Sequence, residues 1–188
     1  MRIVLDAMGG DDAPEVTVEG GVWAAREYGI EVVMVGRQDV LEAELARHET
    51  SGLSLSVVHA SQVLEMEDEP ASAAKTKRNC SMVVGMDLMK RGEAEGFYSA
   101  GNSGGVMAVA LFRLGRIKGT KRPALTAAYP TKEGLCVVLD AGANTDCRPE
   151  WLLQFGIMGS TYAEKALGIQ NPRVGIVSNG EEEGKGST

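Results

Sequence analysis

The chain has few of the residues that build metal centres, disulfide frameworks or membrane spans. Its 188 residues include three cysteines, Cys80, Cys136 and Cys147, which lack CxxC spacing, and two histidines, His48 and His59. A structural zinc site needs about four ligands at short paired spacings. We therefore expect reduced thiols in a reducing compartment and no bound metal. No apolar run approaches the roughly 20 residues that span a bilayer, and no apolar signal region precedes the first strand-like segment.

The patterns of common cofactor and nucleic-acid sites are also missing. The net charge is -7, and the basic residues are scattered, with residues 118–122 as their densest cluster. A nucleic-acid partner is not expected, because nucleic-acid binders usually carry a basic face. There is no GxGxxG fingerprint, and Lys185 is followed by glycine and not by the Ser or Thr of a phosphate-binding P-loop. Because these patterns are absent, we expect no cofactor. No nucleophile–base pair is visible either, so we expect structural roles for both histidines.

Glycine, by contrast, is abundant. The chain has 24 glycines, and most stand beside apolar runs rather than in a low-complexity tract. This placement favours tight turns between strands and helices over disorder.

Short β-rich segments alternate with segments of helical spacing. Strands are predicted at 2–6, 31–35, 53–58, 96–100 and 173–178, and helices at 14–28, 38–48, 81–90, 104–114 and 149–167. The segments 124–129 and 135–139 flank a turn-forming PTKEG, which predicts an antiparallel hairpin. Repeated β-loop-α units predict an α/β fold with a mostly parallel sheet flanked by helices. The methionines at 82, 86 and 89 share one helix side and are expected in the core.

The chain stops inside a glycine-rich loop, and nothing follows the segment 173–178 to pack against it. We therefore expect residues 1–188 to form one α/β domain that continues beyond Thr188.

Four predicted strands end in loops rich in glycine and polar residues. Ligands of open α/β sheets bind beyond the carboxyl ends of the strands. The four loops are DAMGGD at 6–11, SAGNSGG at 99–105, DAGAN at 140–144 and NGEEEGKG at 179–186.

The loop SAGNSGG at 99–105 is the best candidate for binding an anion. Its glycines allow close approach of the backbone, and the helix that follows offers unpaired N–H groups at its positive end. Asn102 and Ser103 add side-chain donors. The alternative is that Ser and Gly only cap the helix.

Asp6 and Asp140 each end a predicted strand, so both could orient donors or a substrate around one crevice. The alternative for each is turn chemistry. Lys185, between two glycines, could neutralise an incoming anion.

Six segments together resemble the bacterial phosphate acyltransferases of phospholipid synthesis. They are LDAMGGDDAP at 5–14, YSAGNSGG at 98–105, GRIKGTKRPAL at 115–125, VLDAGANTDC at 138–147, QFGIMGS at 154–160 and NPRVGIVSNGEEEGKG at 171–186. The departures from the family pattern are small, at Asp12, Ser103 and Thr145, and the first makes a role for position 12 doubtful.

This resemblance implies transfer of a fatty acyl group from acyl carrier protein to inorganic phosphate. The acyl phosphate product would serve a membrane glycerol-3-phosphate acyltransferase. The resemblance also implies a cytoplasmic homodimer that works near the membrane. Its expected fold is a three-layer α/β/α sandwich similar to that of the phosphotransacetylases and isopropylmalate dehydrogenases. On this basis Lys185 and Asn102 are the catalytic candidates. Phosphate-binding candidates are Gly9, Gly10, Ser99, Gly101, Ser103, Gly104, Asp140 and Asn144.

Acyl carrier proteins are acidic, so docking requires a basic patch. Arg116, Lys118, Lys121 and Arg122 are candidates, and a solvated surface loop is the alternative. Three other functions remain open: a phosphotransacetylase-like enzyme using a short acyl-CoA, an NAD-dependent dehydrogenase of related fold, and a non-catalytic binding module.

Overall fold

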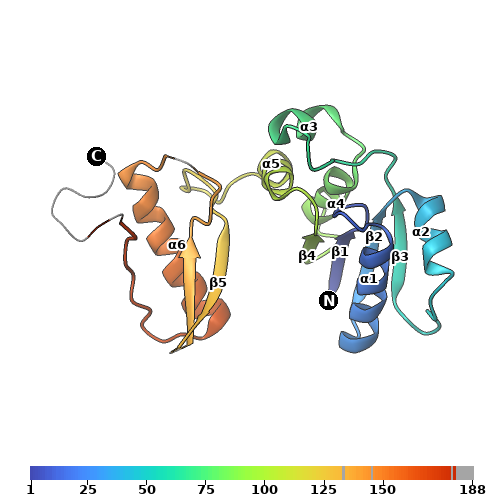
Figure 1. Cartoon of the computed structure of the whole chain (residues 1–188), viewed down its shortest axis with the longest axis horizontal. Coiled ribbons are helices and arrows are strands. Elements are labelled where there is room, and N and C mark those ends of the chain that lie inside the picture. The colour runs from blue at the N-terminus through green and yellow to red at the C-terminus, as the bar shows by residue number, and fades with distance from the viewer. Residues whose placement is uncertain (133, 145, 179, 181–188) are drawn as a thin grey trace. The chain divides into compact units, whose positions relative to one another are not determined.

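The computed structural model describes residues 1–132, 134–144, 146–178 and 180. The chain divides into two compact units, Met1–Gly115 and Arg116–Thr188 (Figure 1). Each unit has its own secondary structure.

The first unit is built on a four-stranded parallel sheet. Its strands are β1 (Arg2–Asp6), β2 (Glu31–Gly36), β3 (Leu55–His59) and β4 (Gly96–Ser99), in the order β3-β2-β1-β4. The register aligns Asp6 at the end of β1 with Val35 of β2 and Ser99 of β4. The four strands predicted in this region are confirmed, with ends displaced by two residues at most.

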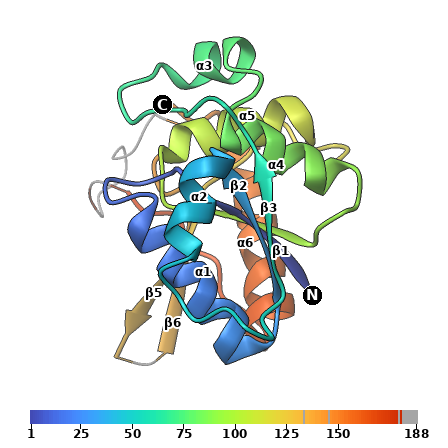
Figure 2. The ribbon, with the colours of Figure 1, turned by 90° about the vertical axis from the view of Figure 1, so that its right-hand side faces the viewer.

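Five helices belong to this unit: α1 (Glu15–Tyr28), α2 (Gln38–Leu45), α3 (Pro70–Thr76), α4 (Ser81–Lys90) and α5 (Ser103–Arg113). Helix α1 ends at Gly29, whose φ of 61° is the left-handed geometry of a glycine cap. Helices α1 and α2 pack beside each other (Figure 2). Helix α3 was not predicted from the sequence. It has only seven residues, and the Glu69 side chain caps it by accepting from the amides of Ala71 and Ser72.

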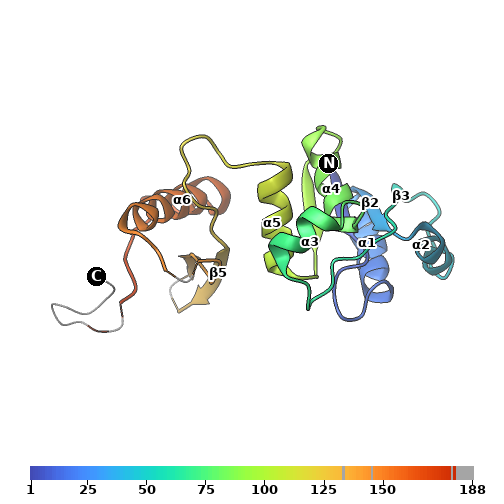
Figure 3. The same cartoon turned by 90° about the horizontal axis from the view of Figure 1, so that it is seen from above.

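Alternating strand residues face two separate layers of helices. Leu5 and Met34 pack in one cluster with Val18 and Val22 of α1. Their neighbours in the strands, including Val4 and Val33, pack with Leu88 of α4. Figure 3 shows α1 and α4 on opposite sides of the sheet. These faces make a three-layer α/β/α arrangement, as predicted.

Two of the three methionines expected in the core, Met82 and Met86, are buried, and Met89 is partly buried against a second cluster. Met82 and Met86 are buried in a cluster that also holds Cys80 and Val109. Burial also raises the pKa of the Cys80 thiol, which keeps it protonated at neutral pH.

The second unit contains the predicted antiparallel hairpin. Strand β5 (Thr126–Thr131) pairs with β6 (Gly134–Leu139), and α6 (Pro149–Leu167) packs on β6. Proline begins α6 and Gly168 ends it with a φ of 69°. Phe155 and Ala163 are the buried residues of this helix.

The prediction of a strand at 173–178 is wrong: this segment is described and is not a strand. Ile176 and Val177 are 78% and 93% exposed. A strand needs a neighbour to accept its hydrogen bonds, and none is paired with this segment among the described residues. Between β6, α6 and this segment lies an open groove of about 1030 Å³.

Within the described residues, no helix combines the length and the apolar character needed to cross a bilayer.

Candidate functional site

The ends of β1 and β4 meet at the carboxyl edge of the sheet, where Asp6 joins two loops. Asp6 is 1% exposed. Its Oδ2 accepts a 2.7 Å hydrogen bond from the Ser99 hydroxyl, and its Oδ1 accepts a 3.3 Å bond from the amide of Met8. The Ser99 hydroxyl oxygen also accepts from the Gly101 amide at 3.1 Å. One buried carboxylate therefore organises both DAMGGD and SAGNSGG.

Gly9 allows these two loops to approach each other. A Cβ at this position would lie 2.5 Å from Asp6 Oδ2 and 3.0 Å from the Gly101 nitrogen. The next residue, Gly10, has a φ of 110°, which side-chain-bearing residues rarely adopt. The loop is anchored further along by Thr17, whose hydroxyl donates to the carbonyl of Ala7 at 2.7 Å. Gly9 is therefore required by the close approach of the two loops, and Gly10 by its backbone conformation.

Asn102 caps α5. Its Oδ1 accepts from the Gly105 amide at 2.9 Å, and its Nδ2 donates to the carbonyls of Met66 at 3.1 Å and Glu65 at 3.4 Å. The capping alternative is therefore real in this structure, and the carboxamide is engaged at both ends. The first-turn amides of Ser103 and Gly104 have no acceptor within the helix.

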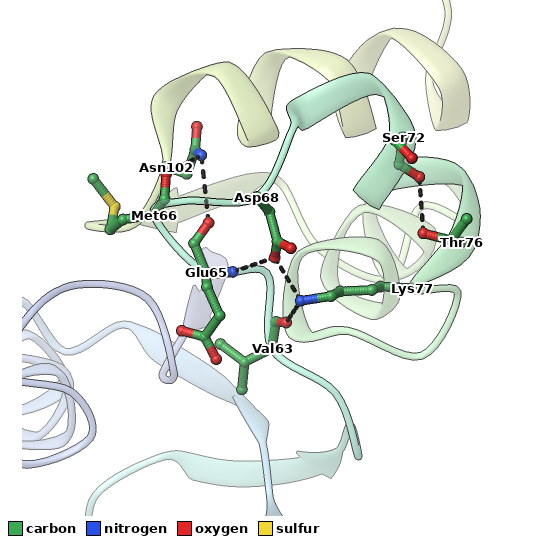
Figure 4. Close-up of polar contacts among 8 residues, drawn as sticks. All are labelled: Val63, Glu65, Met66, Asp68, Ser72, Thr76, Lys77 and Asn102. Carbon is green, nitrogen blue, oxygen red and sulfur yellow. Dashed lines mark hydrogen bonds and ion pairs between the residues drawn. The ribbon is translucent and has the colours of Figure 1, made fainter.

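A second network holds the segment that Asn102 contacts (Figure 4). Lys77 Nζ donates to the Val63 carbonyl at 2.9 Å and to Asp68 Oδ2 at 2.5 Å. The same carboxylate oxygen accepts from the Glu65 amide at 2.7 Å. The hydrogen bond from Lys77, with that from Glu65, lowers the pKa of Asp68. Sequence analysis missed this network, for which the only signal was a lysine following the acidic run EMEDEP at 65–70.

The SAGNSGG loop offers an anion backbone donors and the positive end of an 11-residue helix. Among the described residues, no lysine or arginine side chain is bonded to residues 99–105.

The loop after β6 is organised by Asp140. Its Oδ1 accepts from the Leu125 amide at 2.7 Å, and its Oδ2 accepts from the backbone and side-chain nitrogens of Asn144 at 2.6 and 3.0 Å. Asn144 Nδ2 also donates to the Pro123 carbonyl at 3.1 Å. Burial raises the pKa of Asp140, but the hydrogen bonds from Asn144, Leu125 and Ala143 together outweigh it and lower the pKa. Asp140 thus stays ionised and closes the loop.

The structure brings most of the predicted site residues into two clusters, one in each unit. The first unit holds Gly9, Gly10, Ser99, Gly101, Asn102, Ser103 and Gly104, and the second holds Asp140 and Asn144. Lys185 lies outside the described residues. No group of three or more His, Cys, Asp or Glu side chains in the described part of the chain could hold a metal.

The fold is that of the phosphotransacetylases. A phosphotransacetylase from Streptococcus pyogenes aligns with a TM-score of 0.72 and 15% identity over 97% of this chain and 60% of its own. A second, the EutD phosphotransacetylase from Staphylococcus aureus, aligns with a TM-score of 0.64 and 16% identity over 90% of this chain and 54% of its own. At such identities the likeness defines the fold, and the predicted fold class is confirmed.

The chain belongs to the family described as "Fatty acid synthesis protein", which matches residues 1–188. It is 52% identical over 186 residues to a phosphate acyltransferase from Herpetosiphon aurantiacus, covering 99% of this chain and 50% of that protein. It is 50% identical over 187 residues to a phosphate acyltransferase from Geobacter sulfurreducens, covering 100% and 54%. The resemblance inferred from the motifs is confirmed. The chain spans about half the length of these curated relatives.

Proposed function

We propose that this chain belongs to an acyltransferase that moves a fatty acyl group from acyl carrier protein to inorganic phosphate, and that its loop at 99–105 binds the phosphate. The acyl phosphate would enter phospholipid synthesis. Identity of about half over the whole chain to proteins named phosphate acyltransferase carries this proposal. The anion-suited loop at the start of α5 supports it independently.

The chemistry demands positioning more than activation. A phosphate oxygen attacks the thioester carbonyl carbon, a C–O bond forms, and the C–S bond breaks. The carrier thiolate leaves and takes up a proton from solvent. Phosphate is already a nucleophile and the thioester is already activated, so no covalent enzyme intermediate is required. The protein contributes proximity and stabilisation of the developing oxyanion.

The first-unit loop suits the phosphate side of this reaction. The amides of Ser103 and Gly104 are the donors we assign to phosphate, with Ser99 and Gly101 shaping the loop beneath them. Asn102 supports catalysis from its cap position, since it sets the start of α5. Lys185 is assigned to stabilising transition-state charge, on sequence grounds.

The acyl donor is the part of the proposal to test first. We expect acyl phosphate when the protein is given phosphate and a palmitoyl carrier-protein thioester, and far less with acetyl-CoA. The Geobacter sulfurreducens relative, at full length, serves as positive control. Lys185→Ala should lower turnover roughly 100-fold, in the range found for loss of one oxyanion-stabilising group. Preference for acetyl-CoA would instead identify a phosphotransacetylase-like enzyme.

The phosphate site has its own readout. Amides of residues 99–105 should gain hydrogen-exchange protection in saturating phosphate relative to chloride of equal ionic strength. Unchanged exchange would contradict the assignment of phosphate to this loop, whichever acyl donor is used.

A further inference from the structure

The second unit carries a concentrated positive patch on an otherwise acidic chain. Residues 116–122 contain Arg116, Lys118, Lys121 and Arg122, with no acidic residue among them, while the whole chain has a net charge of -7. All four side chains are exposed. Patches of one sign steer a partner of the opposite sign toward a particular face.

Hydrogen bonds join the loop that carries this patch to α6. Gln154 Oε1 accepts from the Lys121 amide at 2.8 Å, and its Nε2 donates to the Gly119 carbonyl at 3.0 Å. Arg116 Nη1 donates to the Lys121 carbonyl at 2.5 Å. Gln154 thus anchors the middle of the loop to α6 through two backbone hydrogen bonds.

Trp151 of α6 orients two guanidinium groups. The Arg122 guanidinium lies 4.7 Å from the centroid of the Trp151 ring, and that of Arg148 lies 5.6 Å from it. Such stacking fixes a guanidinium while leaving its donors available for a carboxylate. Asp146 and Glu150 are the acidic residues closest in sequence to Arg148. Against these two carboxylates stand five cations, Arg148 and the four of residues 116–122.

The patch is tied directly to the loop after β6. Asn144 Nδ2 donates to the carbonyl of Pro123, the residue that follows Arg122, and the Leu125 amide donates to Asp140. A partner bound on the loop would therefore be held next to two candidate substrate residues, Asp140 and Asn144.

From these contacts we infer that Arg116, Lys118, Lys121, Arg122 and Arg148, the basic patch, form the docking surface for an acidic acyl-carrier protein. The inference rests on the proposed function, because it assigns a place to that reaction's acyl donor. An ordered loop with two oriented guanidiniums suits carboxylates at defined positions on a folded partner. Anionic membranes attract exposed cations at about 1 kcal/mol each whatever their orientation, so oriented guanidiniums favour a folded partner over a lipid surface.

Charge reversal at two exposed lysines tests the patch without removing a described packing contact. Lys118→Glu with Lys121→Glu reverses two charges, and the hydrogen bonds at Lys121 run through its backbone. The matched control is Lys132→Glu with Lys165→Glu, two exposed lysines of the same unit outside the patch. Both double variants change the net charge by the same amount, so non-specific electrostatics are equal.

The measurement is binding of unacylated holo-acyl carrier protein to each protein by fluorescence anisotropy at low and high salt. We expect roughly 10-fold weaker binding for the patch variant and less than roughly 2-fold for the control, with a loss of affinity as salt rises. Circular dichroism establishes that each variant is folded.

Equal weakening in both variants, or no carrier binding to the unmodified protein, would overturn the inference. So would patch-dependent binding to vesicles of anionic phospholipid without patch-dependent carrier binding. The experiment uses no turnover, so it separates the two proposals. Acyl phosphate formation with unchanged carrier binding by the patch variant would sink the docking surface alone. Patch-dependent docking without acyl phosphate formation would sink the proposed reaction alone.

Discussion

The two loops that begin with Asp-Ala after a strand use their aspartates alike but differ in burial. Asp6 and Asp140 each end a strand or directly follow one, and each accepts hydrogen bonds that close a loop. Asp6 is 1% exposed at the carboxyl end of a sheet covered on both faces, whereas Asp140 is only partly buried in a unit built on one hairpin. The comparison teaches that a local pattern predicts the hydrogen bonds, while packing sets how much they contribute to stability.

The largest effect on stability is expected from removing each of the two carboxylates in a separate variant. Asp6→Ala should destabilise the first unit by about 3 kcal/mol, because it leaves the Ser99 hydroxyl and the Met8 amide without their acceptor in the core. Asp140→Ala should cost about 1 kcal/mol, since water can reach its donors. Urea unfolding, monitored by hydrogen exchange of the amides in each unit, measures both changes in the free energy of unfolding. Exposed Asp11→Ala is the control, and equal costs at Asp6 and Asp140 would break the comparison.

Substitution of a glycine in each loop should again destabilise the first unit more than the second, with a smaller difference between the two costs than the aspartates give. Gly9→Ala should cost about 2 kcal/mol, because its Cβ would meet Asp6 Oδ2 at 2.5 Å. Gly142→Ala should cost about 1 kcal/mol, from its φ of 109° alone, since nothing lies within 4 Å of its Cβ. Gly20→Ala, in open space on α1, should be stabilising. A greater cost at Gly142 than at Gly9 would contradict the close approach of the first-unit loops.

The smallest effect is the acid sensitivity of the Asp140 loop. Hydrogen bonds lower its folded pKa, so its contribution to stability is present above the unfolded pKa of about 4 and is lost as pH falls through the folded value. Protection of the Leu125 and Asn144 amides, corrected for intrinsic exchange, should therefore fall below about pH 4. Asp140→Asn, which does not titrate, should remove this dependence. A pH-independent protection in the unmodified protein would argue against an ionised Asp140.

Much of the fold followed from patterns that extend over a whole element. Strands β1 and β2 read as continuous apolar runs, and both are covered on two faces. Helix α6 was predicted with its observed ends, since Pro149 and the glycine at 168 mark them chemically. Burial periodicity and capping residues are local in sequence, which is why they could be read there.

Such local patterns could not predict contacts between segments that are distant in the sequence. The seven-residue α3 is too short for a periodicity signal. Asn102 was predicted to be a donor at a helix start, but its contacts with the carbonyls of Glu65 and Met66 join residues 37 and 36 positions apart. The prediction of a strand at 173–178 failed because apolar spacing cannot supply a pairing partner.

Sequence alone determined the family, the parallel α/β class and the glycine-rich strand ends. Each of these depends on motifs or apolar patterns within contiguous segments of the chain. Tertiary structure decided which polar groups at the strand ends form hydrogen bonds within the protein. The Asp6 and Asp140 carboxylates and the Asn102 carboxamide are occupied by internal partners. In the described loop at 99–105, the backbone amides of Ser103 and Gly104 are donors suited to an anion, since helix geometry gives them no acceptor of their own.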